Sequence, residues 1–321
     1  MKIAFFGTGD FSKNILKNIL KSEKKVEIKL IVSQADKPIG RKKEILPTPV
    51  KSLALDEKIE VLQPEKLKEN KNFFEKLKSL DLDFIVVVAY GKIIPKEILE
   101  IPKFGCINIH GSLLPLYRGA SPIQESLKNG DEKTGLTIMF MSEGMDEGDI
   151  LAKKEVILDI LDKTPDVFKK FENFGAKLLL ETLEQVISSN LKGEKQDEKN
   201  ATYCSKIEKK DGEVDFKKET AFEIYNKFRA YFPWPGIYSF YKGKKLSIED
   251  CFFEEIDLDD EEFSPGDVIE IENEHGEKNY QIGIICKKGV LTLKTIKLEG
   301  KNSTDIKSFL NGNKDFLDYS F

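Results

Sequence analysis

Apolar and polar residues follow two alternating rhythms over the first 189 residues of the chain. Residues 2–7 form a short apolar run that ends in glycine, and the residues after Asp10 repeat apolar side chains at helical spacing. The run at 83–89 is apolar on both faces, which is typical of a central parallel strand. The same rhythms predict strands at 26–32, 60–62, 106–110, 136–141 and 151–158, and helices at 48–57, 66–80, 119–128 and 164–189.

This alternation of strand and helix predicts the α/β class, with a Rossmann-like, doubly wound and mostly parallel sheet. Ligands of such sheets bind beyond the carboxyl ends of the strands. Gly7, Tyr90 and the segment 108–115 all follow predicted strands directly. We therefore expect them to lie near a common ligand site.

The pattern changes after residue 189. A polar, charged segment at 190–205 is interpreted as a linker, and one helix is predicted at 220–231. Short alternating runs then predict strands at 237–241, 245–249, 267–271, 280–286 and 290–297, which favour a small OB-like β-barrel. The predicted domains are a catalytic domain at 1–189, the linker at 190–205, and a C-terminal domain at 206–321.

Composition narrows the classes of protein to which the chain can belong, but it does not indicate a function. No segment approaches the roughly 20 consecutive apolar residues of a membrane helix, and Met1 leads directly into a strand, so we expect a cytoplasmic protein without membrane contact. The net charge of -5 argues mildly against a general nucleic-acid binder, although a local basic face stays open. The four cysteines are scattered and predict free thiols, with no metal site.

Candidate chemistry begins with Asn108 and His110, which share one face of their predicted strand because residues two apart project to the same side. Taken alone, this pair more often indicates a strand end with a hydrogen-bonded core histidine. Asp146 lies in a loop with two glycines, and alone it would be a turn residue. The only other histidine, His275, lies in a polar stretch that is typical of an exposed turn.

Together the three residues favour direct acyl transfer. A carboxamide and an imidazole can donate hydrogen bonds to an oxyanion, and a carboxylate can orient the imidazole or accept a proton. The sequence contains no Gly-x-Ser-x-Gly elbow and no metal-ligand cluster that would favour a covalent or metal mechanism. The turn Gly7-Thr8-Gly9 is only an incomplete dinucleotide fingerprint, because its third glycine position is Ser12.

Several motifs make the chain similar to a known family. It resembles the methionyl-tRNA formyltransferases, which use 10-formyltetrahydrofolate, over nearly its whole length. The C-terminal part favours this family over the smaller purine-pathway relatives, which lack such a domain. The matching residues are Phe6-Gly7-Thr8, Asp10-Phe11, Gly40-Arg41, Pro47 to Lys51, Val86 to Gly91, Cys106 to Pro115, Arg118-Gly119-Ala120, Pro122-Ile123-Gln124, Met145-Asp146, Gly148-Asp149 and Pro233-Trp234-Pro235.

The resemblance implies roles for individual residues. It implies that Asn108, His110 and Asp146 are catalytic, with 10-formyltetrahydrofolate as co-substrate and no metal. It implies a folate-contacting loop and a pterin pocket, formed by Ser112, Leu113, Leu114 and Pro115 and by Ala89, Tyr90, Gly91 and Ile93. It also implies a basic loop at 37–43 that reaches the acceptor stem of initiator methionyl-tRNA. The implied tRNA-binding residues are Arg41, Lys42, Lys43, Lys206, Lys209 and Lys210. The expected oligomeric state is a monomer.

Two departures and several alternatives accompany this interpretation. Gly9 stands where the family commonly has proline, and the C-terminal strands carry many acids, which weakens the expectation of a continuous basic RNA face. Another enzyme of the folate group would act on an amino sugar, a ribonucleotide or water, as a 10-formyltetrahydrofolate hydrolase does. In a different class, the chain would be a nucleotide- or RNA-binding module with a decayed site.

Overall fold

The computed structural model of the chain describes residues 1–39, 44–256, 263–271 and 281–321. These residues form two compact units. Unit 1 contains residues 1–122, 133–157 and 167–206, and unit 2 contains residues 123–132, 158–166 and 207–321. The predicted domain boundaries at 189 and 206 stay a prediction.

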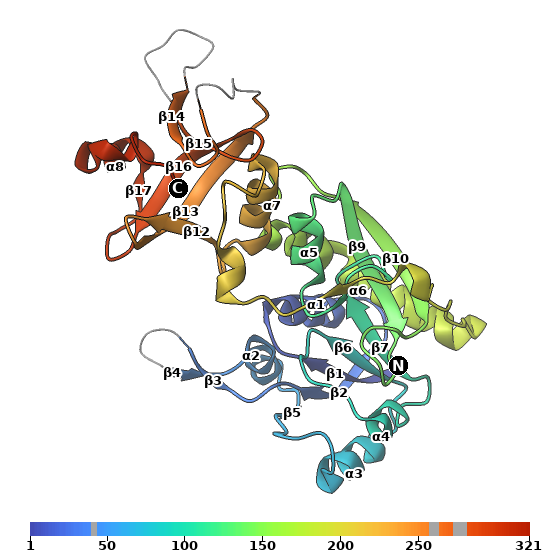
Figure 1. The fold of residues 1–321 in the computed structure, drawn as a ribbon. Helices are drawn as coiled ribbons and strands as arrows, with labels where there is room; N and C mark the ends of the chain where they lie inside the picture. The colour runs from blue at the N-terminus through green and yellow to red at the C-terminus, as the bar shows by residue number, and fades with distance from the viewer. Residues whose placement is uncertain (40–43, 257–262, 272–280) are drawn as a thin grey trace. The chain divides into compact units, whose positions relative to one another are not determined.

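A seven-stranded sheet forms the centre of unit 1 (Figure 1). Neighbouring strands pair in the order β10-β9-β7-β6-β1-β2-β5, and the pairs from β7 to β5 are all parallel. Only β9 breaks this direction, because it is antiparallel to both β7 and β10. The predicted α/β class with a mostly parallel sheet is confirmed. The strands are β1 (Lys2–Gly7), β2 (Glu27–Val32), β5 (Val61–Leu62), β6 (Phe84–Val88), β7 (Cys106–His110), β9 (Lys133–Phe140) and β10 (Ile150–Ile157).

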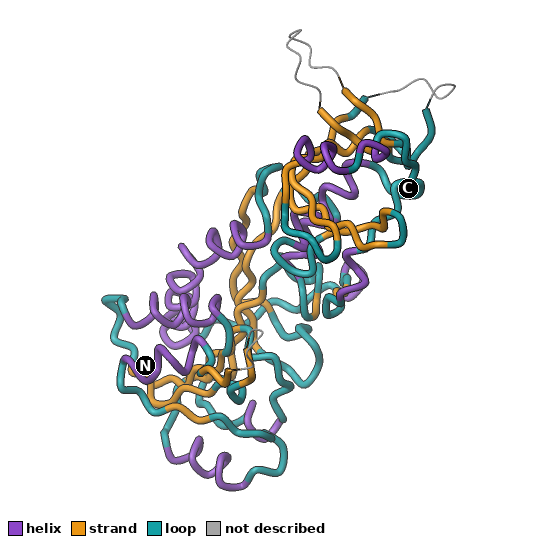
Figure 2. Tube along the Cα trace, turned by 90° about the vertical axis from the view of Figure 1, so that its left-hand side faces the viewer, coloured by secondary structure: helices purple, strands orange, loops and turns teal. Residues whose placement is uncertain are grey.

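Helices cover both faces of this sheet (Figure 2). On one face, Phe73 and Leu77 of α3 (Lys71–Ser79) and Ile98 of α4 (Lys96–Leu99) pack in a core cluster with alternate residues of β1 and β6. On the other face lie α1 (Asp10–Leu20) and most of α6 (Thr164–Ser189), whose Phe11 and Phe168 rings are 5.4 Å apart. A further helix, α2 (Pro49–Asp56), begins with Pro49 next to its N-cap Thr48.

Several elements differ from their predicted limits: the helix predicted at 66–80 is α3 (Lys71–Ser79), and the strand predicted at 245–249 extends over 244–254. The helix expected at 119–128 begins only at Pro122, as α5 (Pro122–Lys128). The preceding residues form β8 (Arg118–Gly119), which pairs in parallel with β11 (Tyr203–Cys204). Gly119 has a φ of +125°, which no helix uses and which favours glycine. The hairpin of β3 (Lys37–Ile39) and β4 (Glu44–Leu46) also has no counterpart among the predicted elements.

Unit 2 contains an antiparallel sheet with the five predicted strands. They pair in the order β12-β13-β16-β15-β14, and β17 (Thr304–Asp305) pairs with β16. The predicted helix is α7 (Ala221–Tyr231), whose Tyr225 ring is 5.0 Å from the Phe252 ring of β13. Closure of the sheet into an OB-like barrel stays a prediction. The remaining elements are β12 (Ile237–Tyr241), β13 (Lys244–Glu254), β14 (Val268–Ile271), β15 (Gln281–Ile285), β16 (Val290–Leu298), α8 (Ile306–Gly312), and the 3-10 turns at 198–200, 209–212 and 314–316.

All four cysteines are buried thiols, and none of them is in a disulfide. Burial raises the pKa of the Cys106 and Cys286 thiols to about 12. Within the described ranges, no helix is long and apolar enough to cross a membrane. In the same ranges, no group of histidine, cysteine or acidic side chains is arranged to hold a metal ion.

Candidate active site

Asn108 and His110 lie at the carboxyl end of β7, which is flanked by β6 and β9. Both side chains project from one face of the strand, because they are two residues apart. Asn108 is half-buried, whereas only 5% of the His110 side chain is exposed. The strand therefore fixes an amide and an imidazole side by side with little freedom to move.

Asp146 comes from the loop between β9 and β10 and meets both of these side chains. Its Oδ1 accepts a hydrogen bond from the Asn108 amide at 3.4 Å, and its Oδ2 lies 3.6 Å from His110 Nδ1. Oδ2 also accepts a hydrogen bond from the backbone N–H of Gly119 at 2.9 Å. The structure thus brings together the three residues that the sequence analysis selected, although they span 38 positions of the chain.

The second ring nitrogen of His110 determines the orientation of the imidazole. Its Nε2 lies 2.9 Å from the backbone carbonyl oxygen of Tyr117. Because a carbonyl can only accept, Nε2 must carry a hydrogen. Nδ1 is therefore the nitrogen that faces Asp146 and that can exchange a proton.

Three residues around this group have a left-handed backbone. Ala89 follows β6 with a φ of +43°, Tyr117 has a φ of +58°, and Asp146 has a φ of +55°. Such conformations cost a non-glycine residue about 1–3 kcal/mol each, and they cluster at functional sites. Their position supports the interpretation that this edge of the sheet is the functional one.

The predicted folate-contacting loop at 112–115 is fixed by hydrogen bonds to Thr137 of β9. Ser112 and Leu114 are fully buried. The Thr137 hydroxyl donates to the Ser112 carbonyl at 2.6 Å and accepts from the Leu114 N–H at 3.1 Å. Leu113 and Pro115 are only half-buried. Within this loop, these two side chains are the ones with surface left for a ligand.

The predicted pterin segment presents its backbone outward and its aromatic ring inward. Tyr90 packs in the core, where burial raises the pKa of its hydroxyl to about 12 and leaves the oxygen without a hydrogen-bond partner. Its carbonyl accepts hydrogen bonds from Thr8 Oγ1 at 3.1 Å and Gln34 Nε2 at 2.7 Å. Ala89 and Gly91 are exposed, as is Ile93, with 82% of its surface accessible.

Gln34, which the sequence analysis did not select, belongs to a second polar network. The backbone carbonyl of Gln34 accepts a hydrogen bond from Gln63 Nε2 at 2.7 Å. The same nitrogen of Gln63 also donates to Asp36 Oδ1 at 2.6 Å. Lys51 Nζ then bonds both Asp36 Oδ2 at 2.5 Å and Gln63 Oε1 at 2.8 Å. The hydrogen bond from Lys51 and then that from Gln63 hold the pKa of Asp36 below its usual value. This network ties the segment at 90–91 to α2.

The predicted tRNA-binding residues are only partly visible. Arg41, Lys42 and Lys43 lie outside the described residues. Lys206 of unit 1 and Lys209 and Lys210 of unit 2 are all exposed. The Lys210 ammonium is 2.8 Å from a carboxylate oxygen of Glu208, whereas no ion pair involves Lys206 or Lys209 within the described ranges.

Two further residues next to Asp146 were not selected from the sequence. Arg118 is fully buried, and Gln196 donates a hydrogen bond to the Asp146 carbonyl at 2.8 Å. Gln196 lies in the segment that the sequence pattern assigns to a linker. The one signal in the sequence that could have indicated this pair is the family motif that contains Arg118. The structure adds that this arginine is buried, which is rare for an arginine without a partner.

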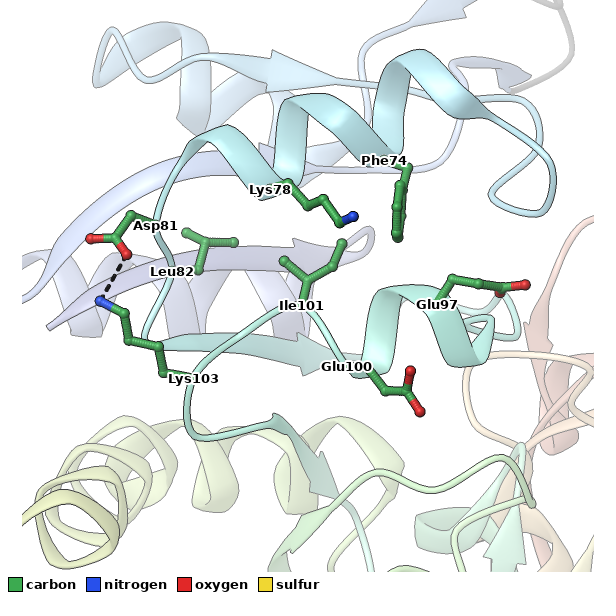
Figure 3. A pocket seen from close by; sticks show the side chains of 8 residues that line it. All are labelled: Phe74, Lys78, Asp81, Leu82, Glu97, Glu100, Ile101 and Lys103. Atoms are coloured by element: carbon green, nitrogen blue, oxygen red, sulfur yellow. Dashed lines mark ion pairs between the residues drawn. The ribbon is translucent and has the colours of Figure 1, made fainter.

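At least two pockets lie within the described residues of unit 1. One, with a volume of about 420 Å³, is next to Asp146 and is lined by Phe140, Met141, Ser142, Glu147, Gly148, Asp149 and Glu198. The other, of about 390 Å³, is shown in Figure 3 and lies between α3 and the segment that contains α4. Its Asp81 and Lys103, which form an ion pair of 2.9 Å, precede β6 and β7. It therefore lies at the amino ends of the strands, and none of the predicted site residues lines it.

Two family models match the chain. The model described as formyl transferase matches residues 1–183, and the model described as formyl transferase, C-terminal domain, matches residues 206–314. Together they cover most of unit 1 and all described strands of the C-terminal sheet.

Curated relatives match over almost the whole length. The chain is 47% identical to the methionyl-tRNA formyltransferase of Caldicellulosiruptor saccharolyticus, over 98% of this chain and 97% of the relative. It is 40% identical to the methionyl-tRNA formyltransferase of Sulfurimonas denitrificans, with the same coverage.

Solved structures share the fold at lower identity. A sugar 3N-formyl transferase, WlaRD, solved with dTDP and 5-N-formyl-THF, is 21% identical with a TM-score of 0.63, over 94% of this chain and 99% of that chain. An N-formyltransferase from Helicobacter canadensis, solved with folinic acid and dTDP-3-aminofucose, is 20% identical with a TM-score of 0.63, over 91% and 98%.

Proposed function

This chain belongs to the formyl transferase family, and from that premise we propose that it transfers a formyl group from 10-formyltetrahydrofolate to the α-amino group of methionyl initiator tRNA. The full-length identity of 36% or more to several methionyl-tRNA formyltransferases supports this choice of acceptor. The observation that carries the proposal is the meeting of Asn108, His110 and Asp146 at the carboxyl end of β7.

In the proposed reaction, the α-amine of methionine attacks the formyl carbon. A new N–C bond forms, the carbonyl becomes a tetrahedral oxyanion, and the bond from carbon to N10 of the folate then breaks. The attacking nitrogen loses a proton, N10 gains one, and tetrahydrofolate leaves. This sequence needs no covalent enzyme intermediate.

Each residue of the trio has a distinct part in this proposal. The Asn108 amide has two N–H groups, of which one bonds Asp146, so the other can donate to the oxyanion. His110 acts in its protonated form, in which both ring nitrogens carry a hydrogen. Its Nδ1 lies 3.6 Å from Asp146 Oδ2, which is beyond a hydrogen bond, so the Nδ1 hydrogen can also reach the oxyanion. Asp146 orients both side chains and assists proton removal from the amine.

The two substrates are assigned to different segments. The folate is proposed to bind beyond the strand ends, against Leu113, Pro115 and the exposed backbone of 89–91. The tRNA is proposed to contact the basic loop at 37–43 and the lysines at 206, 209 and 210. We further propose that the protein acts as a monomer in the cytoplasm.

A direct assay tests this function. The purified chain is incubated with 10-formyltetrahydrofolate carrying a labelled formyl group and with methionyl initiator tRNA. Parallel reactions offer a nucleotide-linked amino sugar, glycinamide ribonucleotide, or no acceptor. We expect label on the methionyl amine only. Faster transfer to one of the small amines, or simple hydrolysis of the folate, would refute the proposed acceptor.

A further inference from the structure

Arg118 is a fully buried arginine whose hydrogen bonds reach across the segment at 196–203. Its Nε donates to Gln196 Oε1 at 3.0 Å, and its two terminal nitrogens donate to the Glu198 carboxylate at 2.9 and 2.7 Å. One of them is also 3.2 Å from the Tyr203 hydroxyl. Hydrogen bonding to Glu198 raises the pKa of the guanidinium further above its usual value. Arg118 is therefore a permanent donor at this place.

Gln196 connects this arginine to the Asp146 loop. Its Nε2 donates to the backbone carbonyls of Asp146 and Gly148, both at 2.8 Å. Because a guanidinium can only donate, it fixes the amide oxygen of Gln196 on its own side. The amide N–H groups must then point to the two carbonyls. If the Gln196 amide were flipped, its NH2 group would face the Arg118 donor and its oxygen would face the carbonyls of Asp146 and Gly148, so all three hydrogen bonds would be lost.

These contacts hold Asp146 from two sides. Its backbone has a φ of +55°, which a non-glycine residue adopts only when its surroundings compensate the strain. Gln196 holds the main-chain carbonyl, and the Gly119 N–H holds Oδ2 of the side chain at 2.9 Å. Gly119 follows Arg118 in β8. This short strand therefore holds the side chain of Asp146 directly, through Gly119, and its backbone indirectly, through Arg118 and Gln196.

We propose that Arg118 and Gln196 are positioning residues that set the place of the Asp146 carboxylate relative to Asn108 and His110. Arg118 acts by orienting the Gln196 amide, and Gln196 acts by holding the backbone of the loop. The inference rests on the proposed function, in that it assigns to Asp146 a part in formyl transfer.

Gln196→Glu is the most direct test. Glutamate keeps the shape and the oxygen that Arg118 bonds, but it removes both N–H donors to the loop. A displacement of about 1 Å at a reacting group can cost about 100-fold in rate, so we expect kcat to fall by about 10- to 100-fold. The KM values for folate and tRNA should change by less than about 3-fold, since the proposed function assigns neither Gln196 nor Arg118 to a substrate-binding segment. An unchanged kcat would overturn the inference.

A matched control separates this effect from the chemical change itself. Gln185 is exposed on α6 in the same unit, so Gln185→Glu makes the same substitution away from the loop. It should leave kcat and the thermal unfolding temperature unchanged.

Double variants show whether Arg118 acts through Gln196 and whether Gln196 acts through Asp146. In the Asp146→Asn background, Gln196→Glu should cause little further loss of kcat, because the group it positions is already disabled. In the Gln196→Glu background, Arg118→Lys should likewise add little. A structural role unrelated to Asp146 would instead give losses that multiply, which would overturn the inference.

A measurement without substrates keeps the two proposals distinguishable. The chain has two histidines, so labelling the ring carbon gives two NMR signals, and His275→Gln identifies that of His110. We expect the His110 signal to shift in Gln196→Glu and in Asp146→Asn, but not in Gln185→Glu. If the wild type does not formylate methionyl-tRNA and the signal shifts as expected, the proposed function fails and the positioning role stands. If formylation occurs and neither kcat nor the signal responds to Gln196→Glu, the positioning role fails alone.

Discussion

At the residue scale, the candidate site depends on one carboxylate with several donors around it. Asp146 faces the Asn108 amide through Oδ1, and His110 Nδ1 and the Gly119 N–H through Oδ2. The carboxylate accepts hydrogen bonds from the Asn108 amide and the Gly119 N–H, and at 3.6 Å from Nδ1 it faces the imidazole without bonding it. A neutral or shorter side chain would leave at least one of them without its partner.

The first prediction concerns the trio. Asn108→Ala, His110→Ala and Asp146→Ala should each lower kcat for formyl transfer by about 100- to 1,000-fold, which is the usual cost of losing an oxyanion donor and also falls within the usual cost of losing a general base. Their circular dichroism spectra should match the wild type. Steady-state assays with methionyl-tRNA measure the effect.

His275→Ala provides the control, because it removes the other histidine from a predicted exposed turn. It should retain wild-type turnover. Near-normal activity in any one of the three site variants would remove that residue from the mechanism.

The second prediction concerns Asp36, whose pKa is lowered in the folded state by Lys51 and Gln63. A lowered folded-state pKa stabilises the protein above the unfolded value of 3.8, and this contribution is lost as the pH falls through the folded value. Asp36→Asn should therefore lower the free energy of unfolding by about 1.5 kcal/mol near neutral pH. The difference from wild type should shrink steadily as the pH falls below about 4.

Urea denaturation at several pH values measures this difference. Lys29→Gln disrupts an exposed ion pair with Glu27 and serves as the comparison, with an expected change of less than about 0.5 kcal/mol. A pH-independent difference for Asp36→Asn would show that the carboxylate charge is not the cause.

At the element scale, the short pairing of β8 with β11 brings the 196–204 segment to the Asp146 loop. Each strand has only two residues, and the pairing requires close backbone approach at Gly119. A Cβ atom on Gly119 would lie 2.1 Å from the Cys204 carbonyl oxygen. Glycine is therefore required there by both φ and space.

The third prediction follows from this contact. Gly119→Ala should separate β8 from β11 and remove the N–H bond to Asp146. We expect a loss of about 1–3 kcal/mol in the free energy of unfolding and a clear fall in kcat. Chemical denaturation and steady-state kinetics measure the two effects.

Gly9→Ala is the matched control for this substitution. Gly9 has a φ of -86° and no atom within 4 Å of an added Cβ, so alanine fits without strain. Equal effects of the two alanines would contradict the role assigned to β8.

At the scale of the whole molecule, the candidate chemistry belongs to unit 1, whereas the predicted tRNA lysines come from both units. Acidic residues exceed basic ones, so any attraction for a polyanion has to be local. The exposed lysines at 206 and 209 are the clearest candidates, because Lys210 already pairs with Glu208.

The fourth prediction is a dependence on salt. The KM for methionyl-tRNA should rise with salt, and Lys206→Ala and Lys209→Ala should each lower the slope of log KM against log salt by about 1, while kcat and the KM for folate stay unchanged. Lys210→Ala should have a smaller effect. Lys297→Ala, an exposed lysine of β16, is the control. Equal slopes in all four variants would exclude these lysines from the tRNA contact.

The sequence alone determined the elements whose patterns are local. Runs of apolar residues at a period of two or near 3.6 predicted β1, β6, α6, α7 and the strands of unit 2, because these periods decide which face each element buries. The position of Asn108 and His110 at a strand end followed from the same pattern. The chemistry of an amide, an imidazole and a carboxylate grouped Asp146 with them, and the family motifs then implied a catalytic role for all three.

Only the tertiary structure decided which distant groups meet. β9 is antiparallel to β7 and ends beside Ile107 at the start of that strand, so Asp146 meets Asn108 and His110 only because the loop after β9 folds back along β7. Gln196 reaches the same loop from a polar segment with no periodic signal. β8 and β11 are too short to have a period, so their pairing depends on a glycine at φ +125° and on the buried Arg118. Local sequence patterns do not predict such contacts, because the contacts stabilise the protein only after segments far apart in the chain have come together.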